Sequence, residues 1–425
     1  MAGLTCAVYL KQAGVDALLL DGADGVGGRV RTDMVDGFRL DRGFQILLTA
    51  YPEARRLLDY TALDLQQFRS GALIRDPVSD ASARWMTLLN PFQEPFSVFQ
   101  TLASPIGTLG DKLRIFSLMR RTQELSIAEL FQQSPTTTLA LLHETGFSDR
   151  MIERFFRPFF GGVFLEDALT TSSNFFEFCF RMFFSGDAAV PARGIGAIPD
   201  QLAGRLSPEQ VRLRTLVRRI DGHTVTLESG KTLTGGAVVL AVDAVQAAVL
   251  LGNTERGGTA RSFNHTTCTY FAAPESPKSI PTKKLLMLNT RRSSAVHNLA
   301  VMSDVAPAYA PVGESEPHRR TGGIALISVS THGLKTVNEP TLTERIRQEL
   351  TDWFGPDVRT WRHLRTYHLP HALPGYDALS NGSQTSRPLK LTESLYQCGD
   401  QTSYPSLNAA MQTGRDVAEM ILGRK

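Results

Sequence analysis

Two short motifs, far apart in the chain, combine glycine with a charged side chain in a way that suits a phosphate-bearing ligand. The first is Gly27-Gly28-Arg29, where glycine permits close backbone approach and arginine offers a fork of donors for phosphate oxygens. Taken alone, this motif is more typical of an ordinary β-turn. The second is Gly399-Asp400, which follows an expected strand at 394–398 and precedes an expected helix at 406–422. The Asp400 carboxylate can accept hydrogen bonds from hydroxyls of a sugar-like chain, and the free helix N-terminus favours partial negative charge, so this second motif predicts a cofactor clamp.

The beginning of the chain has the pattern of a helix and a strand from a nucleotide-binding βαβ unit. A helix is expected from Met1 to Gly14, followed by an apolar strand at 15–20 that ends on Asp21. An intact unit needs a strand and two more glycines directly before Gly3. We therefore expect either that the natural start lies upstream of Met1 or that the part holding a pyrophosphate is lost.

Composition limits the classes of function. The 425 residues are enough for two domains, and 45 basic and 42 acidic residues leave a net charge of +3, so no nucleic-acid partner is expected. Four scattered cysteines indicate neither a zinc site nor a disulfide framework and fit a reducing, cytoplasmic compartment. His368 and His371 flank Pro370 and lack companion ligands, so we expect them to be structural and predict no metal site.

Other motifs and segments are missing from the sequence. It contains neither a G-x-S-x-G elbow nor a G-x-x-x-x-G-K-[ST] loop, which argues against α/β-hydrolase and P-loop chemistry. No apolar run is long enough to span a bilayer.

The middle of the chain is expected to be helical. Apolar spacing near the 3.6-residue period predicts helices at 50–60, 110–121, 127–133 and 138–143. The stretch 155–184 carries eleven phenylalanines, which predicts two helices packed in a core. A few of these rings are expected to line a pocket for a bulky apolar substrate or to face a membrane surface.

Strands dominate the later part. We expect a short helix at 198–206, two strand-turn-strand units at 211–220 and 223–228, and a buried parallel strand at 236–241. Residues 260–335 alternate in polarity between many breakers, which predicts an antiparallel sheet with long loops. A capping box at 341–344 predicts the start of a helix that ends at Gly355.

Read together, these blocks resemble the flavin-containing amine oxidoreductase superfamily, which includes amine oxidases, protoporphyrinogen oxidase and phytoene-desaturase-like enzymes. The matching pieces occur in the family's order along nearly the whole chain. They are Gly3-Leu4 with Asp21, Gly27-Gly28-Arg29, Leu40-Asp41-Arg42-Gly43, residues 216–220, residues 238–241, and the segment from Gly399-Asp400 to Gly414-Arg415. Residues 154–200, which end in the 190–196 stretch, are more similar to the desaturase and protoporphyrinogen-oxidase side.

The resemblance implies an FAD site made from most of these pieces. Asp21 would bind the adenosine ribose, while Gly3, Gly27, Gly28 and Arg29 would approach the pyrophosphate.

The same resemblance implies contacts at the other end of the cofactor. Gly43 and Phe44 would pass their backbone near the isoalloxazine ring, and Val217 would contact the adenine through its main chain. Gly399 and Asp400 would hold the ribityl-phosphate region. Leu407 and Asn408 would place the last helix N-terminus near the flavin pyrimidine edge, where N–H groups stabilise developing negative charge.

The resemblance implies hydride transfer from a substrate carbon to flavin N5, with oxygen or a quinone-like molecule as the electron acceptor. Amine oxidases usually carry a cage tyrosine in the final Gly-Asp segment, but residues 405–408 contain no aromatic, and no flavin-side lysine can be placed. A small apolar organic substrate, of polyene or tetrapyrrole type, is therefore favoured over an amine. Trp361 and Tyr367 either edge its pocket or belong to a core sheet. No single side chain is assigned as catalytic, and peripheral membrane contact is a further expectation.

The expected fold class is α/β. A Rossmann-like FAD domain lacking its first strand would comprise residues 1–75, 190–250 and 390–425. An α+β substrate domain, with inserted helices and an antiparallel sheet, would comprise residues 76–189 and 251–389. Two alternatives stay open: a non-enzymatic scaffold of flavoenzyme ancestry, and a nicotinamide-dependent dehydrogenase, against which the Gly399-Asp400 clamp argues.

Overall fold

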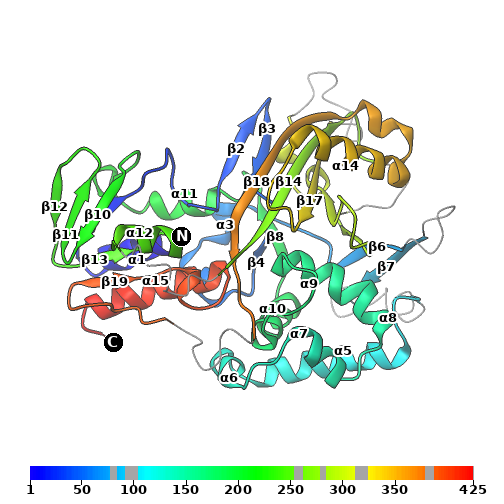
Figure 1. The fold of residues 1–425 in the computed structure, drawn as a ribbon, viewed down its shortest axis with the longest axis horizontal. Helices are drawn as coiled ribbons and strands as arrows, with labels where there is room; N and C mark the ends of the chain where they lie inside the picture. Colours follow the sequence, from blue (N-terminus) through cyan, green and yellow to red (C-terminus); the bar gives the residue numbers. More distant parts are fainter. Residues whose placement is uncertain are drawn as a thin grey trace.

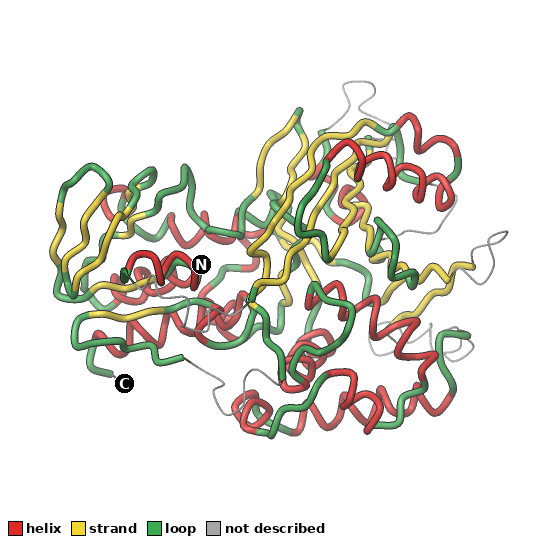
Figure 2. The backbone as a smooth tube through the Cα atoms, in the orientation of Figure 1, coloured by secondary structure: helices red, strands yellow, loops and turns green. Residues whose placement is uncertain are grey.

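The computed structural model describes residues 1–76, 84–90, 104–252, 262–277, 284–311, 324–378 and 387–424. Within these ranges the chain has a mixed α/β fold. A large sheet, a layer of helices and a group of short parallel strands lie side by side (Figure 1, Figure 2). The expected α/β class with an α+β portion is confirmed. The division into two domains stays a prediction.

The large sheet has seven strands within the described ranges. In spatial order they are β18 (Arg362–Pro374), β14 (Phe263–Ala273), β17 (Ala325–His332), β16 (Asn298–Val301), β15 (Leu286–Asn289), β6 (Gly71–Asp76) and β7 (Arg84–Leu89). All neighbouring pairs are antiparallel except β15 and β6, which run parallel. The antiparallel sheet expected at 260–335 is thus present, and it also includes strands from before and after that range.

Both faces of this sheet are covered, so its strands are buried throughout much of their length. One face packs on α14 (Glu339–Phe354), whose buried side chains include Leu350 and Trp353. The other face packs on β3 (Phe38–Asp41) and on α13 (Met302–Val305). The expected capping box at 341–344 is wrong: the helix begins two residues earlier, and the Asn338 side chain accepts a hydrogen bond from the Thr341 N–H.

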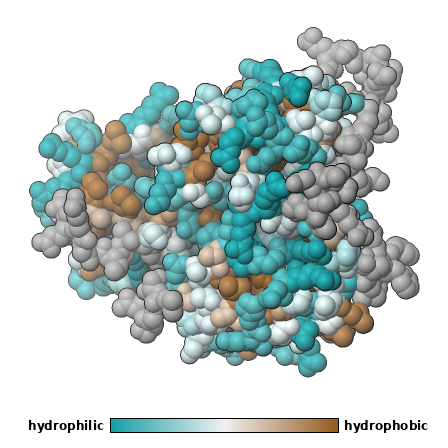
Figure 3. Space-filling view, turned by 45° about the vertical axis from the view of Figure 1, so that its right-hand side comes forward, coloured by the Kyte–Doolittle hydropathy of each residue, from teal (hydrophilic) through white to brown (hydrophobic). Residues whose placement is uncertain are grey.

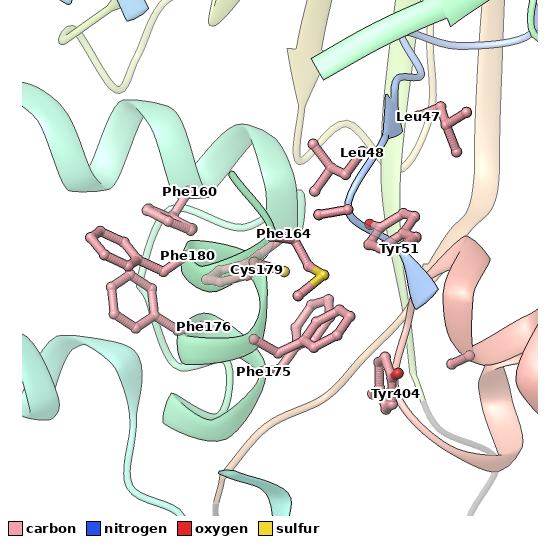
Figure 4. Packing of buried hydrophobic residues seen from close by; sticks show 14 of the residues in the cluster. Leu47, Leu48, Tyr51, Phe160, Phe164, Phe175, Phe176, Cys179, Phe180 and Tyr404 are labelled. Atoms are coloured by element: carbon pink, nitrogen blue, oxygen red, sulfur yellow. The ribbon is translucent and has the colours of Figure 1, made fainter. Parts of the chain in front are cut away.

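A layer of helices lies below the sheet in Figure 1. It consists of α5 (Leu109–Glu124), α6 (Ile127–Gln132), α7 (Thr138–Glu144), α8 (Asp149–Met151), a π-helical turn (Ile152–Phe156), α9 (Arg157–Phe164) and α10 (Ser173–Ser185). The phenylalanines of 155–184 pack between α9 and α10, as Figure 4 shows for Phe160, Phe164 and Phe176. The expected pair of packed helices is confirmed. Among the described helices, none is long and apolar enough to cross a bilayer.

The third group consists of short parallel strands with helices around them. β1 (Leu19–Leu20) pairs with β9 (Val211–Arg212), and β13 (Val238–Leu240) pairs with β19 (Leu395–Gln397). The helices are α1 (Ala2–Gln12), α11 (Ala197–Ala203), α12 (Ala244–Leu250) and α15 (Leu407–Ile421). The remaining strands are β2 (Thr32–Val35), β4 (Leu47–Leu48), β5 (Leu65–Gln67), β8 (Ala188–Pro191), β10 (Val217–Asp221), β11 (Thr224–Leu227) and β12 (Thr232–Thr234).

Two expected elements are shorter or divided. The strand expected at 15–20 is reduced to β1, which pairs with only the two residues of β9. The strand-turn-strand unit expected at 211–220 is present as β9, a turn at Arg214 with a left-handed φ of 51°, and β10. The N–H groups of Arg214 and Thr215 donate to the carbonyls of Ala23 and Asp21 instead of to a strand.

The helix expected at 50–60 is also divided. It forms α2 (Pro52–Leu57) and α3 (Tyr60–Leu63), separated by an extended Leu58. Asp59 then caps α3, because its carboxylate accepts a hydrogen bond from the Ala62 N–H.

The packing of α1 on α15 generates the first prediction. A Cβ added at Gly414 would collide with the carbonyl oxygen of Ala2, which lies in the facing helix. We expect Gly414→Ala to lower the free energy of unfolding in urea by about 2–3 kcal/mol, because overpacking forces the two helices apart. Gly204→Ala is the matched control, since the added Cβ would meet only ordinary contacts of 3.4 Å and beyond. Equal losses in both variants would contradict this explanation.

Candidate functional site

The carboxyl-terminal ends of three strands lie around the N-terminus of α1. β1 leads into Asp21, β13 into Val242 and Asp243, and its parallel neighbour β19 into Gly399 and Asp400. A Cβ added at Gly3 of α1 would lie 3.0 Å from Ala241 and 3.9 Å from Leu19, so this helix packs between β1 and β13. Loops at the carboxyl ends of parallel strands are the usual ligand site of open α/β sheets.

The loop after β1 has glycines with two different roles. Gly27 and Gly28 have left-handed φ values of 105° and 62°. A Cβ at Gly27 would collide with Val30 and Pro199, so the fold itself requires glycine there. A Cβ at Gly28 would meet no protein atom within 4 Å. The space above Gly28 is therefore open, and the predicted approach of a ligand there stays a prediction.

Arg29 and Asp400 form the direct link between the two motifs. The Arg29 Nη2 lies 2.6 Å from the Asp400 Oδ1, and its Nη1 donates to the Ala372 carbonyl at 2.8 Å. The Asp400 side chain is buried, whereas the Arg29 guanidinium is partly exposed. Because guanidinium carries five N–H donors, Arg29 keeps donors for an anion while it remains paired with Asp400.

The edge next to Asp21 is apolar and exposed. The Asp21 carboxylate accepts a hydrogen bond from the Ala23 N–H at 2.9 Å. Leu216 lies beside Gly22, where an added Cβ would come within 2.6 Å of it, and Leu216 is 61% exposed. Exposed apolar side chains beside a polar turn suit the flat face of a heteroaromatic base. The open glycine turn, the guanidinium and this apolar edge fit the phosphate and base of a dinucleotide.

We call the loops after β1, β13 and β19, together with the N-terminus of α15, the cradle. The N-terminus of α15 forms its far end. Ser406 caps the helix by accepting a hydrogen bond from the Ala409 N–H at 3.0 Å. The N–H groups of Leu407 and Asn408 belong to the first turn, so their own helix offers them no carbonyl partner. The Asn408 side chain has other contacts: its Oδ1 accepts from the Glu53 N–H at 3.0 Å, and its Nδ2 donates to the Tyr404 hydroxyl at 2.8 Å.

A buried carboxylate supports the Gly43 turn. Asp41 accepts hydrogen bonds from the Thr32 hydroxyl at 2.6 Å, the Tyr309 hydroxyl at 2.7 Å and the Ile195 N–H at 3.0 Å. Burial raises its pKa to about 6, although these three hydrogen bonds act in the opposite direction. Two residues later, Gly43 has a φ of 98°, and an added Cβ would lie 2.7 Å from Leu369. Asp41 thus fixes the backbone that leads to Gly43, which is predicted to lie beside the isoalloxazine ring.

A cavity of about 360 Å³ adjoins the α15 end of the cradle. It lies between α2, α6 and α15, and Asn408 belongs to both the cavity and the cradle. Phe131 and Tyr404 stack at 4.4 Å between ring centroids, and Tyr404 also contacts Phe178 at 4.8 Å. The lining residues are Pro52, Glu53, Ile127, Ala128, Phe131, Ser403, Tyr404, Asn408 and Gln412. This volume and lining suit an apolar ring-containing molecule.

The predicted site residues fall into two groups. The structure places Asp21, Gly28, Arg29 and Asp400 along the strand ends, with Arg29 and Asp400 in direct contact. The roles of these residues toward FAD stay predictions.

Other predicted site residues have their own partners in the protein. The Phe44 ring packs edge-on against Phe68 at 6.0 Å. The Val217 main chain lies opposite Leu227 in an antiparallel pair. Their predicted backbone contacts with the cofactor also stay predictions.

Aromatic residues outside the cradle separate into core and cavity. Trp361 is buried beside α14, and the Tyr367 hydroxyl donates to Asp33 at 2.8 Å, so both belong to the sheet. Tyr404 is not among the predicted site residues, because it lies one residue before the 405–408 stretch, which contains no aromatic. An aromatic residue directly next to that stretch is the signal in the sequence that points to it. The phenylalanines of 155–184 are buried or half-buried, as expected for a core, while the membrane contact of a few of these rings stays a prediction.

The histidines expected to be structural have partners in the sheet. His368 Nδ1 lies 3.2 Å from the Thr267 hydroxyl, and His371 stacks on Phe263 at 4.7 Å. Within the described ranges, no three His, Cys, Asp or Glu side chains are placed to hold a metal ion together.

Comparison with known proteins gives a consistent result. Residues 1–422 match the family of flavin-containing amine oxidoreductases. The chain is 30% identical over 281 residues to the coproporphyrinogen III oxidase of Mycobacterium tuberculosis strain H37Rv. That alignment covers 59% of this chain and 59% of the relative, so the chain spans less than two thirds of the curated relatives it matches.

Solved structures share the fold over almost the whole chain. An oxidoreductase from Methanosarcina mazei superposes with a TM-score of 0.72 at 16% identity, covering 99% of this chain and 98% of that one. A proposed protoporphyrinogen oxidase from Exiguobacterium sp. 255-15 superposes with a TM-score of 0.70 at 16% identity, covering 100% and 97%.

The buried carboxylate makes stability depend on pH. The pKa of Asp41 in the folded protein, about 6, lies above its ordinary value of 3.8, so the folded state binds this proton more tightly. The group therefore contributes stability as pH falls from 6 toward 4, and this contribution is lost as pH rises through 6. Between pH 7.5 and pH 5.0 we expect wild type to gain about 1 kcal/mol from Asp41 in urea unfolding.

Asp41→Asn removes this gain, because asparagine has no proton to bind. The exposed carboxylate Asp221 provides the control, and Asp221→Asn should keep the wild-type pH dependence. Identical pH profiles for wild type and Asp41→Asn would show that Asp41 does not titrate in this range.

Proposed function

Because this chain belongs to the flavin-containing amine oxidoreductase family and is an FAD-dependent oxidoreductase, we propose that it dehydrogenates a large apolar substrate. The substrate class we favour is a reduced tetrapyrrole, with a polyene second and an amine last. One observation carries the proposal: the apolar, ring-lined cavity adjoins the end of the cradle where the flavin ring is expected, and the two share Asn408.

The residues of the chain have distinct roles in this proposal. When bound, FAD supplies a flavin N5 that accepts a hydride from a substrate carbon, while a proton leaves the substrate to solvent. Arg29 and the open Gly28 turn would hold the pyrophosphate, and Asp41 would keep the Gly43 backbone in place for the ring. The first-turn N–H groups of α15 would stabilise negative charge that develops on the flavin.

The cavity supports an apolar substrate over an amine. Its walls are mostly apolar or aromatic, and its one acidic group, Glu53, is already paired with Arg415 at 3.0 Å. An ammonium group entering this cavity would therefore find its counter-charge occupied. Among the described residues, no lysine lines it. The similarity to coproporphyrinogen III oxidase directs the first test to porphyrinogens.

The open space above Gly28 generates a prediction about cofactor affinity. Gly28→Ala should weaken FAD binding at least tenfold in equilibrium titration by flavin fluorescence, because the methyl group occupies the space left for the pyrophosphate. Gly222→Ala is a closely matched control: Gly222 has a φ of 57°, against 62° for Gly28, and an added Cβ likewise meets nothing within 4 Å. Both variants carry the same backbone strain, so equal FAD affinity in both would contradict the placement of the pyrophosphate.

The substrate class is tested by anaerobic reduction of the FAD-loaded protein. We expect coproporphyrinogen III or protoporphyrinogen to bleach the flavin absorbance within one turnover, while putrescine leaves it unchanged. Ala128→Trp narrows the cavity and should raise the porphyrinogen concentration needed for half-maximal bleaching at least tenfold, with FAD content unchanged. Bleaching by putrescine alone would overturn the substrate proposal. A chain that never retains FAD would favour the scaffold alternative.

A further inference from the structure

One end of the cavity beside α15 is polar, and its side chains form a directed chain of hydrogen bonds. The Asn408 Oδ1 accepts from the Glu53 N–H at 3.0 Å, so the Asn408 Nδ2 is the donor to the Tyr404 hydroxyl at 2.8 Å. The Tyr404 hydroxyl in turn donates to the Gln412 Oε1 at 3.5 Å. Because each bond fixes the direction of the next, the chain determines how the Gln412 carboxamide is oriented.

This orientation leaves the two N–H groups of Gln412 available. Its Oε1 receives the Tyr404 proton, and burial raises the pKa of Tyr404 far above its usual range, so the hydroxyl keeps that proton. Among the described residues, no acceptor lies within hydrogen-bond distance of the Gln412 Nε2. Gln412 is half-buried and lines the cavity. Its Nε2 is therefore a pair of free donors at the polar end.

The acidic group of the cavity does not take these donors. The Glu53 carboxylate accepts from the Arg415 Nε at 3.1 and 3.0 Å and lies 3.0 Å from the Arg415 Nη2. The opposite wall is apolar and includes Ile127 and Phe131 of α6. The cavity thus combines apolar walls with the free N–H groups of Gln412.

The location of these donors decides what a bound molecule must offer. On the outer face in Figure 3, hydrophilic residues surround separate groups of hydrophobic ones, and a polar group there bonds to water. A molecule that fills the cavity displaces the water around Gln412. A pure hydrocarbon would then leave both N–H groups without an acceptor, which is costly. A molecule with an acceptor oxygen at this end avoids that cost.

We propose, starting from the dehydrogenation proposed above, that Gln412 selects a ring substrate whose side arms carry acceptor oxygens, either carboxylate or carbonyl. The Gln412 Nε2 donates to one such oxygen, while the apolar ring packs against Phe131 and Tyr404, the stacked pair of the cavity wall. Between the two substrate classes favoured above, this role selects a porphyrinogen with carboxylate arms over a hydrocarbon polyene. Gln412 acts on binding and takes no part in hydride transfer.

The test is equilibrium binding of three porphyrins to the FAD-loaded protein, followed by porphyrin fluorescence anisotropy. Coproporphyrin III, its tetramethyl ester and octaethylporphyrin share the ring, but their arms end in carboxylate, ester and alkyl groups. Gln412→Glu keeps the acceptor for Tyr404 and replaces the N–H groups by a carboxylate oxygen. It should bind coproporphyrin III at least tenfold more weakly than wild type and octaethylporphyrin equally well, because only the first loses a charge-assisted hydrogen bond. A smaller loss for the ester identifies carboxylate as the partner, and an equal loss identifies carbonyl.

Gln246→Glu is the matched control, because it adds the same charge at an exposed glutamine of α12 and should bind all three porphyrins like wild type. Gln412→Met removes the donors without adding charge, and it should lose affinity for coproporphyrin III while it keeps the wild-type thermal midpoint. Unchanged coproporphyrin III binding in Gln412→Met, or no binding of any porphyrin to wild type, would overturn the role of Gln412.

The outcome also separates this role from the proposed reaction. If the arms control binding through Gln412 but no porphyrinogen bleaches the flavin, the role of Gln412 is supported and the dehydrogenation is contradicted. If porphyrinogens bleach wild type and Gln412→Met at the same concentrations, the dehydrogenation is supported and the role of Gln412 is contradicted.

Discussion

The buried carboxylate of Asp41 is the constraint on which the centre of this structure depends. Among the described residues it has no cationic partner, and its hydrogen bonds come from the neutral donors Thr32, Tyr309 and the Ile195 main chain. These donors come from three separate parts of the chain, so a single carboxylate fixes the hairpin, the turn after β8 and the segment after α13 relative to one another. Unpaired buried charge is costly. The protein maintains this cost two residues before Gly43, whose backbone is predicted to lie beside the isoalloxazine ring.

The cradle is an assembly of backbone edges more than of side chains. Its glycines serve different needs: Gly27 is required by packing against Pro199, while Gly28 leaves space that no protein atom fills. Charged groups around this space already form ion pairs within the protein, as Arg29 and Asp400 do. Such a site is preorganised, because a ligand does not have to reorder long flexible side chains when it binds. The adjoining cavity differs in kind, since stacked rings such as Phe131 and Tyr404 define its shape.

The residues at the strand ends could be predicted from the sequence, whereas the residues that hold Asp41 in place could not. Glycine turns, the Gly399-Asp400 motif and the helix after it are local patterns, so their positions could be read directly. The partners of Asp41 could not, because Thr32, Ile195 and Tyr309 approach it only through tertiary packing. The same limit applies to the strand expected at 15–20, which is shortened to the two residues that pair with β9, a strand from a distant part of the chain. The predicted N-cap of α14 was wrong for a simpler reason. Asn338 and Thr341 are both residues that commonly cap helices, and only the folded chain shows that Asn338 is the cap.

The contact between Arg29 and Asp400 joins residues 371 positions apart. It therefore sets an order on biosynthesis. While a ribosome has released Arg29 but not yet β19 and α15, the nascent chain lacks the carboxylate partner of the Arg29 guanidinium. This side of the candidate site is therefore completed only after residues 395–421 have emerged.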